Sequence, residues 1–254
     1  MNTRIYTPKP TSFIYSINES DQYWAQHHTG GDNARIVLLP DWEGAHTAWA
    51  QRIASTYAMT CQAEVILTDP YGVDNACPSF DAAAVFNQRC LNHPDQARIM
   101  LRGMAKALSN QWCNDGPLIF VGFCSGGAYS FEAGRADLGA DAVFCVHGNP
   151  QSPMPLQHAG RYPVFWVVHG HDDPIITSDQ IMSFESEMLQ VNAVWSLHVI
   201  SGAKHSFTRF DSRFENDAVG YSQRAEVETR HLVRSQIASF HEMRASRIET
   251  CKKG

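Results

Sequence analysis

Short apolar runs alternate with amphipathic segments along most of the chain. Runs that are apolar throughout and rich in β-branched or aromatic residues predict buried strands at residues 35–39, 64–68, 118–122, 142–147, 164–169 and 195–200. Segments with apolar residues at helical spacing predict helices at residues 45–59, 97–111, 126–135, 178–189 and 224–246. Continuously apolar strands are typical of parallel sheets that are covered on both sides. The alternating order therefore predicts an α/β fold, with a doubly wound, mostly parallel sheet and helices on both faces.

Two parts of the chain depart from this alternation. Residues 1–34 predict an irregular N-terminal segment, in which residues 11–17 are a candidate outer strand before the polar stretch 18–33. Residues 70–95 are rich in Asn, Pro and Cys and predict an excursion over the edge of the sheet where ligands gather. Because no linker, repeat or low-complexity tract interrupts the chain, we expect a single domain over residues 1–254.

The composition is that of a globular protein with a large core. Hydrophobic residues make up 44% of the chain and charged residues 18%, which excludes a disordered protein. The 26 acidic residues outnumber the 20 basic ones, and no basic run is longer than Lys252–Lys253, so we expect no nucleic-acid partner. The first ten residues lack the apolar region of a signal peptide, and no apolar run reaches the roughly 18 residues that span a bilayer. We therefore expect no membrane partner and a cytoplasmic location.

The cysteines predict neither disulfides nor a metal site. The chain has seven of them, an odd number, with no Cys-x-x-Cys pair and no zinc-finger spacing. Free thiols in a reducing compartment fit this pattern, and one of the thiols has an unusual sequence context.

An apolar strand runs directly into Gly122-Phe-Cys124-Ser-Gly126-Gly127 and then into a helical segment. This pattern predicts a nucleophile elbow with cysteine in the usual serine position, because a turn this tight needs glycine on both sides of the nucleophile. The N-terminus of the helix would favour the thiolate of Cys124, and the N–H group of Ser125 would form half of an oxyanion hole. The alternative is that Cys124 is a small buried hydrophobic residue.

An elbow cysteine needs an acid and a base, which in this topology follow it along the chain, each just after a strand. Asp172 and Asp173 follow the strand at 164–169; we favour Asp173, which directly precedes Pro174 at the end of the turn, and keep Asp172 as the alternative. His205 lies in a glycine-containing loop after the last apolar strand. The competing interpretations are a turn or helix-capping aspartate and a surface histidine.

Three segments, 121–128, 170–174 and 204–209, together resemble the dienelactone hydrolase (carboxymethylenebutenolidase) family of α/β-hydrolases. The resemblance covers roughly residues 30–243. It implies an α/β-hydrolase-like fold and a Cys-His-Asp hydrolase that cleaves a small ester or lactone through a thioester, with no metal or organic cofactor. It also implies that Arg209 binds a carboxylate of the substrate through a bidentate pair, whereas an unspecialised arginine would be a solvated surface residue.

The same resemblance assigns roles to the segment after the first apolar strand. The family has a glutamate three positions before Gly44 that contacts the resting thiol; this chain has Asp41 there, one methylene shorter, and Glu43 is the alternative. The N–H group of Trp42 is the implied second oxyanion donor. Both acids could instead serve the N-terminus of the next helix. A second substrate-binding arginine, expected in the excursion, is Arg89.

Two other functions compete with the hydrolase. Glutamine amidotransferases also place a cysteine on such an elbow, but their base normally occurs as His-x-Glu, whereas Phe207 lies two residues after His205. The second competitor is a protein of hydrolase-like fold that binds a ligand without cleaving it, with Cys124 as a redox-sensing thiol. The sequence leaves the oligomeric state open.

Overall fold

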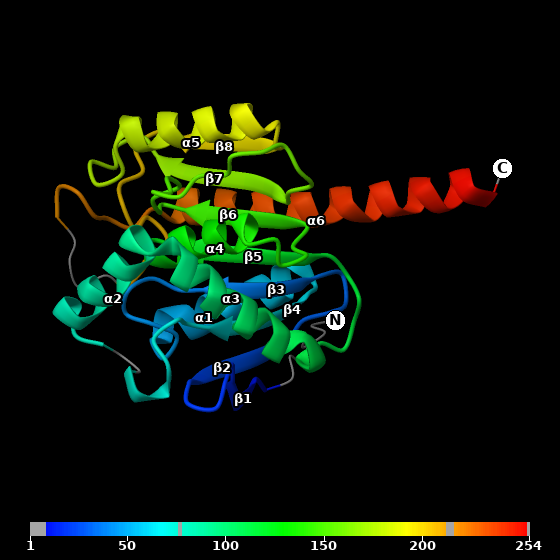
Figure 1. Ribbon diagram of the computed structural model, residues 1–254, viewed down its shortest axis with the longest axis horizontal. Coiled ribbons are helices and arrows are strands. Elements are labelled where there is room, and N and C mark those ends of the chain that lie inside the picture. The colour runs from blue at the N-terminus through cyan, green and yellow to red at the C-terminus, as the bar shows by residue number, and fades with distance from the viewer. Residues whose placement is uncertain (1–8, 76–77, 212–215, 253–254) are drawn as a thin grey trace, which may run out of the picture.

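A computed structural model describes residues 9–75, 78–211 and 216–252 and contains one eight-stranded sheet (Figure 1). Its strands are β1 (Thr11–Ser16), β2 (Gln22–Thr29), β3 (Arg35–Leu39), β4 (Glu64–Thr68), β5 (Leu118–Phe123), β6 (Ala142–Val146), β7 (Val164–Gly170) and β8 (Trp195–Ile200). They lie in the order β1-β2-β4-β3-β5-β6-β7-β8. All pairs from β3 onward are parallel, and β1 and β2 are antiparallel to their neighbours. The predicted α/β class with a mostly parallel sheet is confirmed.

Helices cover both faces of this sheet. They are α1 (Ala48–Cys61), α2 (Phe80–Asn92), α3 (Pro94–Leu108), α4 (Ser125–Arg135), α5 (Ser178–Val191) and α6 (Gln223–Lys252), with short 3-10 turns η1 (Val73–Asn75) and η2 (Ser109–Gln111). Side chains that accept a hydrogen bond from the first turn mark three of the starts: Thr47 caps α1, Ser79 caps α2 and Thr177 caps α5. Gln180 completes a capping box at the start of α5.

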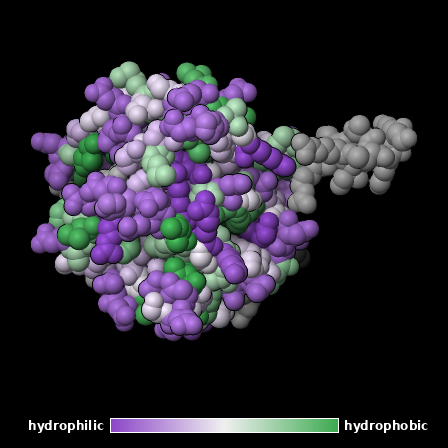
Figure 2. Space-filling model, in the orientation of Figure 1, coloured by the Kyte–Doolittle hydropathy of each residue, from purple (hydrophilic) through white to green (hydrophobic). Residues whose placement is uncertain are grey.

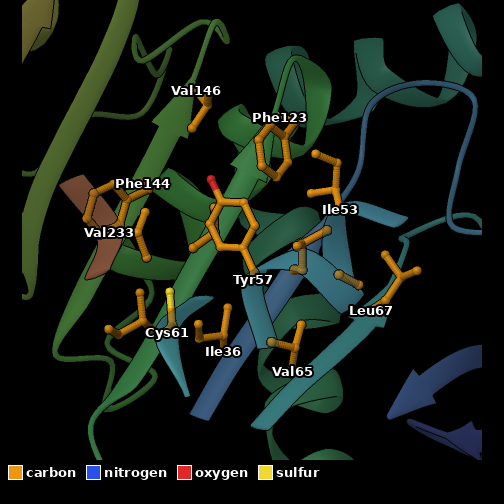
Figure 3. Close-up of a cluster of buried hydrophobic side chains, with 14 of the residues drawn as sticks. Ile36, Ile53, Tyr57, Cys61, Val65, Leu67, Phe123, Phe144, Val146 and Val233 are labelled. Atoms are coloured by element: carbon orange, nitrogen blue, oxygen red, sulfur yellow. The ribbon is translucent and has the colours of Figure 1, made fainter. Parts of the chain in front are cut away.

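The sheet separates two buried clusters of apolar side chains. On one face, α1 and α6 pack on the central strands, and Figure 3 shows Ile53, Tyr57 and Cys61 of α1 among the side chains of the sheet. On the other face, α3, α4 and α5 contribute Leu101, Phe131 and Phe184 among others. Because each central strand is covered on both sides, β4 and β6 are buried along their whole length. This burial explains why their sequences are apolar without alternation.

One strand and one α-helix were missing from the prediction, both in the parts that depart from the alternation. β2 lies inside the predicted polar stretch 18–33, and α2 lies inside the excursion 70–95. The polar residues of β2 have partners that the sequence does not show: His27 lies 2.9 Å from Glu64, and His28 lies 3.0 Å from Ser55. A strand near the edge of a sheet can therefore carry polar residues on both faces. Residues 1–8 of the predicted irregular segment and residues 76–77 of the excursion lie outside the described residues.

The surface is mixed in character. Figure 2 shows hydrophilic side chains over most of one face, with hydrophobic ones scattered between them. Within residues 9–75, 78–211 and 216–252, no helix is long and apolar enough to cross a membrane.

Candidate active site

Cys124 occupies the turn between β5 and α4, at the end of the sheet where the parallel strands finish. Its backbone angles, φ 52° and ψ −116°, lie in a region that residues other than glycine rarely adopt. Such a conformation costs about 1–3 kcal/mol and persists only where the surroundings enforce it. Here the Cys124 N–H donates to the carbonyl oxygen of Val146, and the Cys124 carbonyl accepts from Gly127, both at 3.0 Å. The turn at Cys124 therefore has the strained backbone conformation that is typical of a nucleophile elbow.

Two glycines let backbone segments approach each other closely at this turn. A Cβ atom on Gly122 would lie 1.9 Å from the carbonyl oxygen of Gly126, and one on Gly126 would lie 2.2 Å from those of Leu39 and Pro40. Both positions therefore require glycine. The second contact also shows that the end of β3 packs against the elbow, so the loop that begins at Asp41 lies beside the start of α4.

A continuous chain of hydrogen bonds joins Cys124, His205 and Asp173. The Cys124 sulfur lies 3.2 Å from Nε2 of His205, and Nδ1 of His205 lies 2.8 Å from Oδ2 of Asp173. The three residues come from the loops after β5, β8 and β7, which end at the same edge of the sheet (Figure 1). Asp173 is buried, and its other oxygen accepts the N–H groups of Ile175 at 2.8 Å and Ile176 at 3.2 Å.

Of the two candidate aspartates, the structure brings Asp173 to His205. Asp172 is exposed, and its backbone N–H donates to the carbonyl oxygen of Ala203 at 3.0 Å. The turn thus directs adjacent carboxylates to opposite environments, one into the protein and one to the solvent.

The electrostatics of this chain favour a charged imidazole. Burial alone lowers the pKa of His205, but the negative charge of Cys124 and the hydrogen bonds to Asp173 and Cys124 outweigh it and raise the pKa to about 10. At neutral pH the Nε2–H group of an imidazolium therefore faces the sulfur. An imidazolium next to a cysteine stabilises the thiolate, which is the nucleophilic form.

A second histidine, His147, lies behind His205 and was not among the predicted site residues. It directly follows β6, has a φ of 40° and is 1% exposed. Its Nε2 atom lies 2.9 Å from the hydroxyl of Thr208, and its ring packs edge-on against His205 with centroids 5.5 Å apart. Burial and the positive charges of His205 and Arg209 lower the pKa of His147 far below its ordinary value. The one signal in the sequence was its position at the carboxyl end of the strand predicted at residues 142–147, and the structure ends β6 one residue earlier, at Val146.

Arg209 is surrounded by carboxylates of the protein itself. Its NH1 atom donates to Oδ2 of Asp41 at 2.5 Å, its NH2 atom to Oε2 of Glu43, and its Nε atom to Oδ1 of Asp211 at 3.0 Å. Burial raises the pKa of Asp41 to about 6, although Arg209 acts in the opposite direction. The resemblance implied that Asp41 or Glu43 contacts the thiol; among the described residues no hydrogen bond joins either carboxylate to the sulfur of Cys124, and both are directed to Arg209.

The two predicted oxyanion donors, Ser125 and Trp42, lie at the start of α4 and in the loop after β3. Ser125 is the first residue of α4, where backbone N–H groups have no acceptor within the helix. Trp42 lies in the loop after β3, and its ring packs edge-on against Phe80 of α2 at a centroid distance of 5.2 Å. The hydroxyl of Tyr71 accepts a hydrogen bond from Nδ2 of Asn87 at 3.4 Å. The N–H groups of Ser125 and Trp42 stay our prediction for the oxyanion hole.

Among the described residues, no hydrogen bond joins Arg89 to Cys124, His205 or Asp173. It is exposed in the last turn of α2, and its guanidinium is 5.7 Å from the ring centroid of Phe86. Both residues line a cavity of about 440 Å³ with Tyr71 and Tyr129. In the described parts of the chain, no group of three or more His, Cys, Asp or Glu side chains could hold a metal ion.

Comparison with known proteins agrees with the fold. The sequence matches the model of the dienelactone hydrolase family over residues 24–239. One curated relative is carboxymethylenebutenolidase 2 of Cupriavidus pinatubonensis, which is 24% identical over 186 residues, or 68% of this chain and 73% of that protein.

Two solved structures illustrate the likeness of fold. A dienelactone hydrolase-like promiscuous phosphotriesterase from metagenomic libraries has a TM-score of 0.81 and 20% identity, with 91% of this chain and 98% of that chain covered. A dienelactone hydrolase from Anabaena variabilis has a TM-score of 0.62 and 13% identity, with 92% and 99% covered.

Proposed function

Because the chain belongs to the dienelactone hydrolase family, we propose that it hydrolyses a small ester or lactone with Cys124 as the nucleophile, His205 as the proton carrier and Asp173 as the group that orients it. The observation that carries this proposal is the hydrogen-bonded chain from the sulfur through both ring nitrogens to a buried carboxylate. A nucleophile, a base and an orienting acid in this order are what covalent acyl transfer needs.

The first half of the reaction forms a thioester. The thiolate of Cys124 attacks the carbonyl carbon, and the electron pair of the C=O bond moves to oxygen, where the N–H groups of Ser125 and Trp42 stabilise the negative charge. When this intermediate collapses, the bond to the alcohol oxygen breaks. The departing oxygen takes the proton from Nε2 of His205, which leaves the imidazole neutral.

The second half restores the enzyme. Neutral His205 accepts a proton from water as the water oxygen attacks the thioester carbon. Collapse of the second tetrahedral intermediate breaks the C–S bond and releases the carboxylic acid and the thiolate, again facing an imidazolium. Asp173 stabilises that charge and holds Nδ1 in its protonated tautomer throughout, since its own position is fixed by the N–H groups of Ile175 and Ile176.

The test is trapping of the acyl enzyme with para-nitrophenyl acetate. We expect a burst of nitrophenol equal to the enzyme concentration, and an acetyl group on the peptide that contains Cys124 in the mass spectrum of quenched enzyme. Cys124→Ala should keep the fold, as judged by circular dichroism, and lose both signals. Turnover by Cys124→Ala at the wild-type rate would overturn the proposal.

The same measurement separates the two competing functions. A ligand-binding protein with a redox-sensing thiol would show no acyl enzyme, whereas reversible oxidation of Cys124 by peroxide would persist. The amidotransferase arrangement is disfavoured by the partner of His205, which is Asp173, an aspartate 32 positions earlier in the chain.

A further inference from the structure

Asp69, which directly follows β4, holds the loop in which the predicted oxyanion donor Trp42 lies. Its Oδ2 atom accepts the backbone N–H of Ala45 at 2.7 Å, and its Oδ1 atom accepts the backbone N–H of Tyr71 at 3.0 Å. Asp69 is 6% exposed, so water does not readily replace either donor. One buried carboxylate therefore ties the loop after β3 to the loop after β4, and no step of the proposed reaction uses this group.

The loop after β3 is fixed at both of its ends. At its start it packs against the elbow, because a Cβ on Gly126 would lie 2.2 Å from two carbonyl oxygens at and just after the end of β3. At its other end, Ala45 is held by the buried carboxylate. Between these two points the N–H of Gly44 donates to the carbonyl oxygen of Asp41 at 3.0 Å, which closes a four-residue turn that contains Trp42.

Gly44 allows the carboxylate to approach this turn closely. Its φ is 82°, a value that favours glycine, and a Cβ on it would lie 3.0 Å from Oδ2 of Asp69. An oxyanion donor acts only when its N–H points at the charged oxygen from about 3 Å, and a misplacement of about 1 Å can cost about 100-fold in rate. The direction of the Trp42 N–H therefore depends on how firmly both ends of the loop are held.

We propose that Asp69 is a positioning residue for the oxyanion hole: by holding Ala45, its carboxylate sets the direction in which the N–H of Trp42 faces the carbonyl oxygen of the substrate. This role rests on the proposed function, because the oxyanion forms only when the thiolate of Cys124 attacks an ester. Asp69 acts through the backbone of the loop. It therefore affects the steps that form an oxyanion and leaves the reactivity of the sulfur unchanged.

Two reactions of Cys124 separate these effects. Acylation by para-nitrophenyl acetate passes through a tetrahedral oxyanion, and stopped-flow measurement of the nitrophenol burst gives its rate constant at saturating ester. Alkylation by iodoacetamide forms no oxyanion, because the thiolate sulfur bonds to the methylene carbon as iodide leaves. Peptide mass spectrometry over time gives the alkylation rate at Cys124. The ratio of the two rates reports on the oxyanion hole and is independent of the nucleophilicity of the sulfur.

Asp69→Ala removes both acceptors. We expect its acylation rate constant to fall about 10- to 100-fold, with the half-saturating ester concentration and the alkylation rate each within about threefold of wild type. Asp69→Asn is the milder variant, because its one amide oxygen accepts only one of the two N–H groups and its NH2 group faces the other. It should show a smaller fall in acylation, again without a change in alkylation.

Glu64→Ala is the control for lost stability. Glu64 is also buried, is the first residue of the same strand, and accepts the backbone N–H of Cys113 at 3.0 Å, at the end of β4 away from Asp69. We expect this variant to lose stability in urea as Asp69→Ala does, and to be acylated at the rate of wild type.

The outcomes that overturn this role differ from those that overturn the proposed function. If wild type is acylated, an unchanged acylation rate in Asp69→Ala, or equal falls in its acylation and alkylation rates, would overturn the role of Asp69. An equal fall of acylation in Glu64→Ala would do the same. If neither Asp69 variant folds, Asp69 serves the fold and the positioning role is overturned. Absence of acylation in wild type would overturn the proposed function, and the role of Asp69 with it.

Discussion

The hydroxyl of Thr208 and Nε2 of His147 lie 2.9 Å apart, and this contact fastens the loop that carries His205 to the end of β6. Both residues are about 1% exposed, so neither group can exchange its partner for water. A second hydrogen bond holds the same loop, because the indole N–H of Trp49 donates to the backbone carbonyl of Thr208. The backbone of His205 also pairs with Ala218 and Gly220, at 3.0 and 3.1 Å, so the position of His205 depends on this pairing and on how firmly the residues that follow it are held.

Thr208→Val should therefore weaken both the fold and the catalysis. The substitution keeps the shape of the side chain and leaves His147 without its partner, which costs about 1–3 kcal/mol when the group is buried. We expect a loss of this size in urea denaturation. We also expect kcat/KM for para-nitrophenyl acetate to fall several-fold with little change in KM. Thr60→Val, on α1, is the control for the chemical change, and equal effects of the two variants on kcat would contradict the role assigned to Thr208.

His147 should make the protein sensitive to acid. Its pKa is lowered in the folded protein, so the ring stays neutral there while the unfolded chain takes up a proton near pH 6.5. The stability that depends on neutral His147 is present above that pH and is lost as the pH falls below it. His147→Phe removes the titrating group and keeps an aromatic ring in the cavity. The unfolding free energy of wild type should therefore fall more than that of His147→Phe as the pH is lowered from 6.5. A difference that is constant over that range would show that His147 does not carry the effect.

The sheet and the elbow could be predicted from the sequence because the features that determine them are local. A strand buried on both faces must be apolar throughout, as β4 and β6 are, and a turn as tight as that at Cys124 needs glycine at defined positions. The order of Asp173 and His205 after their strands followed from the chain topology. The choice of Asp173 over Asp172 followed from the proline next to it.

The contacts of Arg209 could not be predicted in the same way. Its partner Asp41 is 168 positions away in the sequence, and the spacing of either residue says nothing about the other. The resemblance identified both positions but implied that they act separately, one on the substrate and one on the thiol. β2 was missed for a related reason, because its histidines are satisfied by Glu64 and Ser55, which belong to other elements. When the partner of a polar residue lies far away in the sequence, the sequence alone makes that residue look like a surface residue.

Asp173→Asn tests the orienting role of the carboxylate. The amide has nearly the same shape but loses the negative charge, so it no longer stabilises the imidazolium or enforces the tautomer with the proton on Nδ1. We expect kcat/KM to fall by up to about 10⁴-fold, as for other triads of this kind. Asp172→Asn makes the identical change one residue earlier, on an exposed side chain, and should retain activity close to that of wild type. Comparable losses in the two variants would show that the turn, and not the carboxylate on His205, is responsible.

The raised pKa of His205 predicts how stability depends on alkaline pH. The folded protein holds the proton up to about pH 10, whereas the unfolded chain loses it near 6.5. The stabilisation from the charged ring is therefore complete below 6.5 and is lost as the pH rises from 6.5 through 10. His205→Gln keeps a hydrogen-bonding side chain beside Asp173 but cannot titrate, so its unfolding free energy should fall less than that of wild type over this interval. Cys124→Ser removes the negative charge that raises the pKa most, and in this variant the alkaline loss should begin at lower pH. If wild type and Cys124→Ser lose stability over the same pH interval, the sulfur does not carry the charge that faces His205.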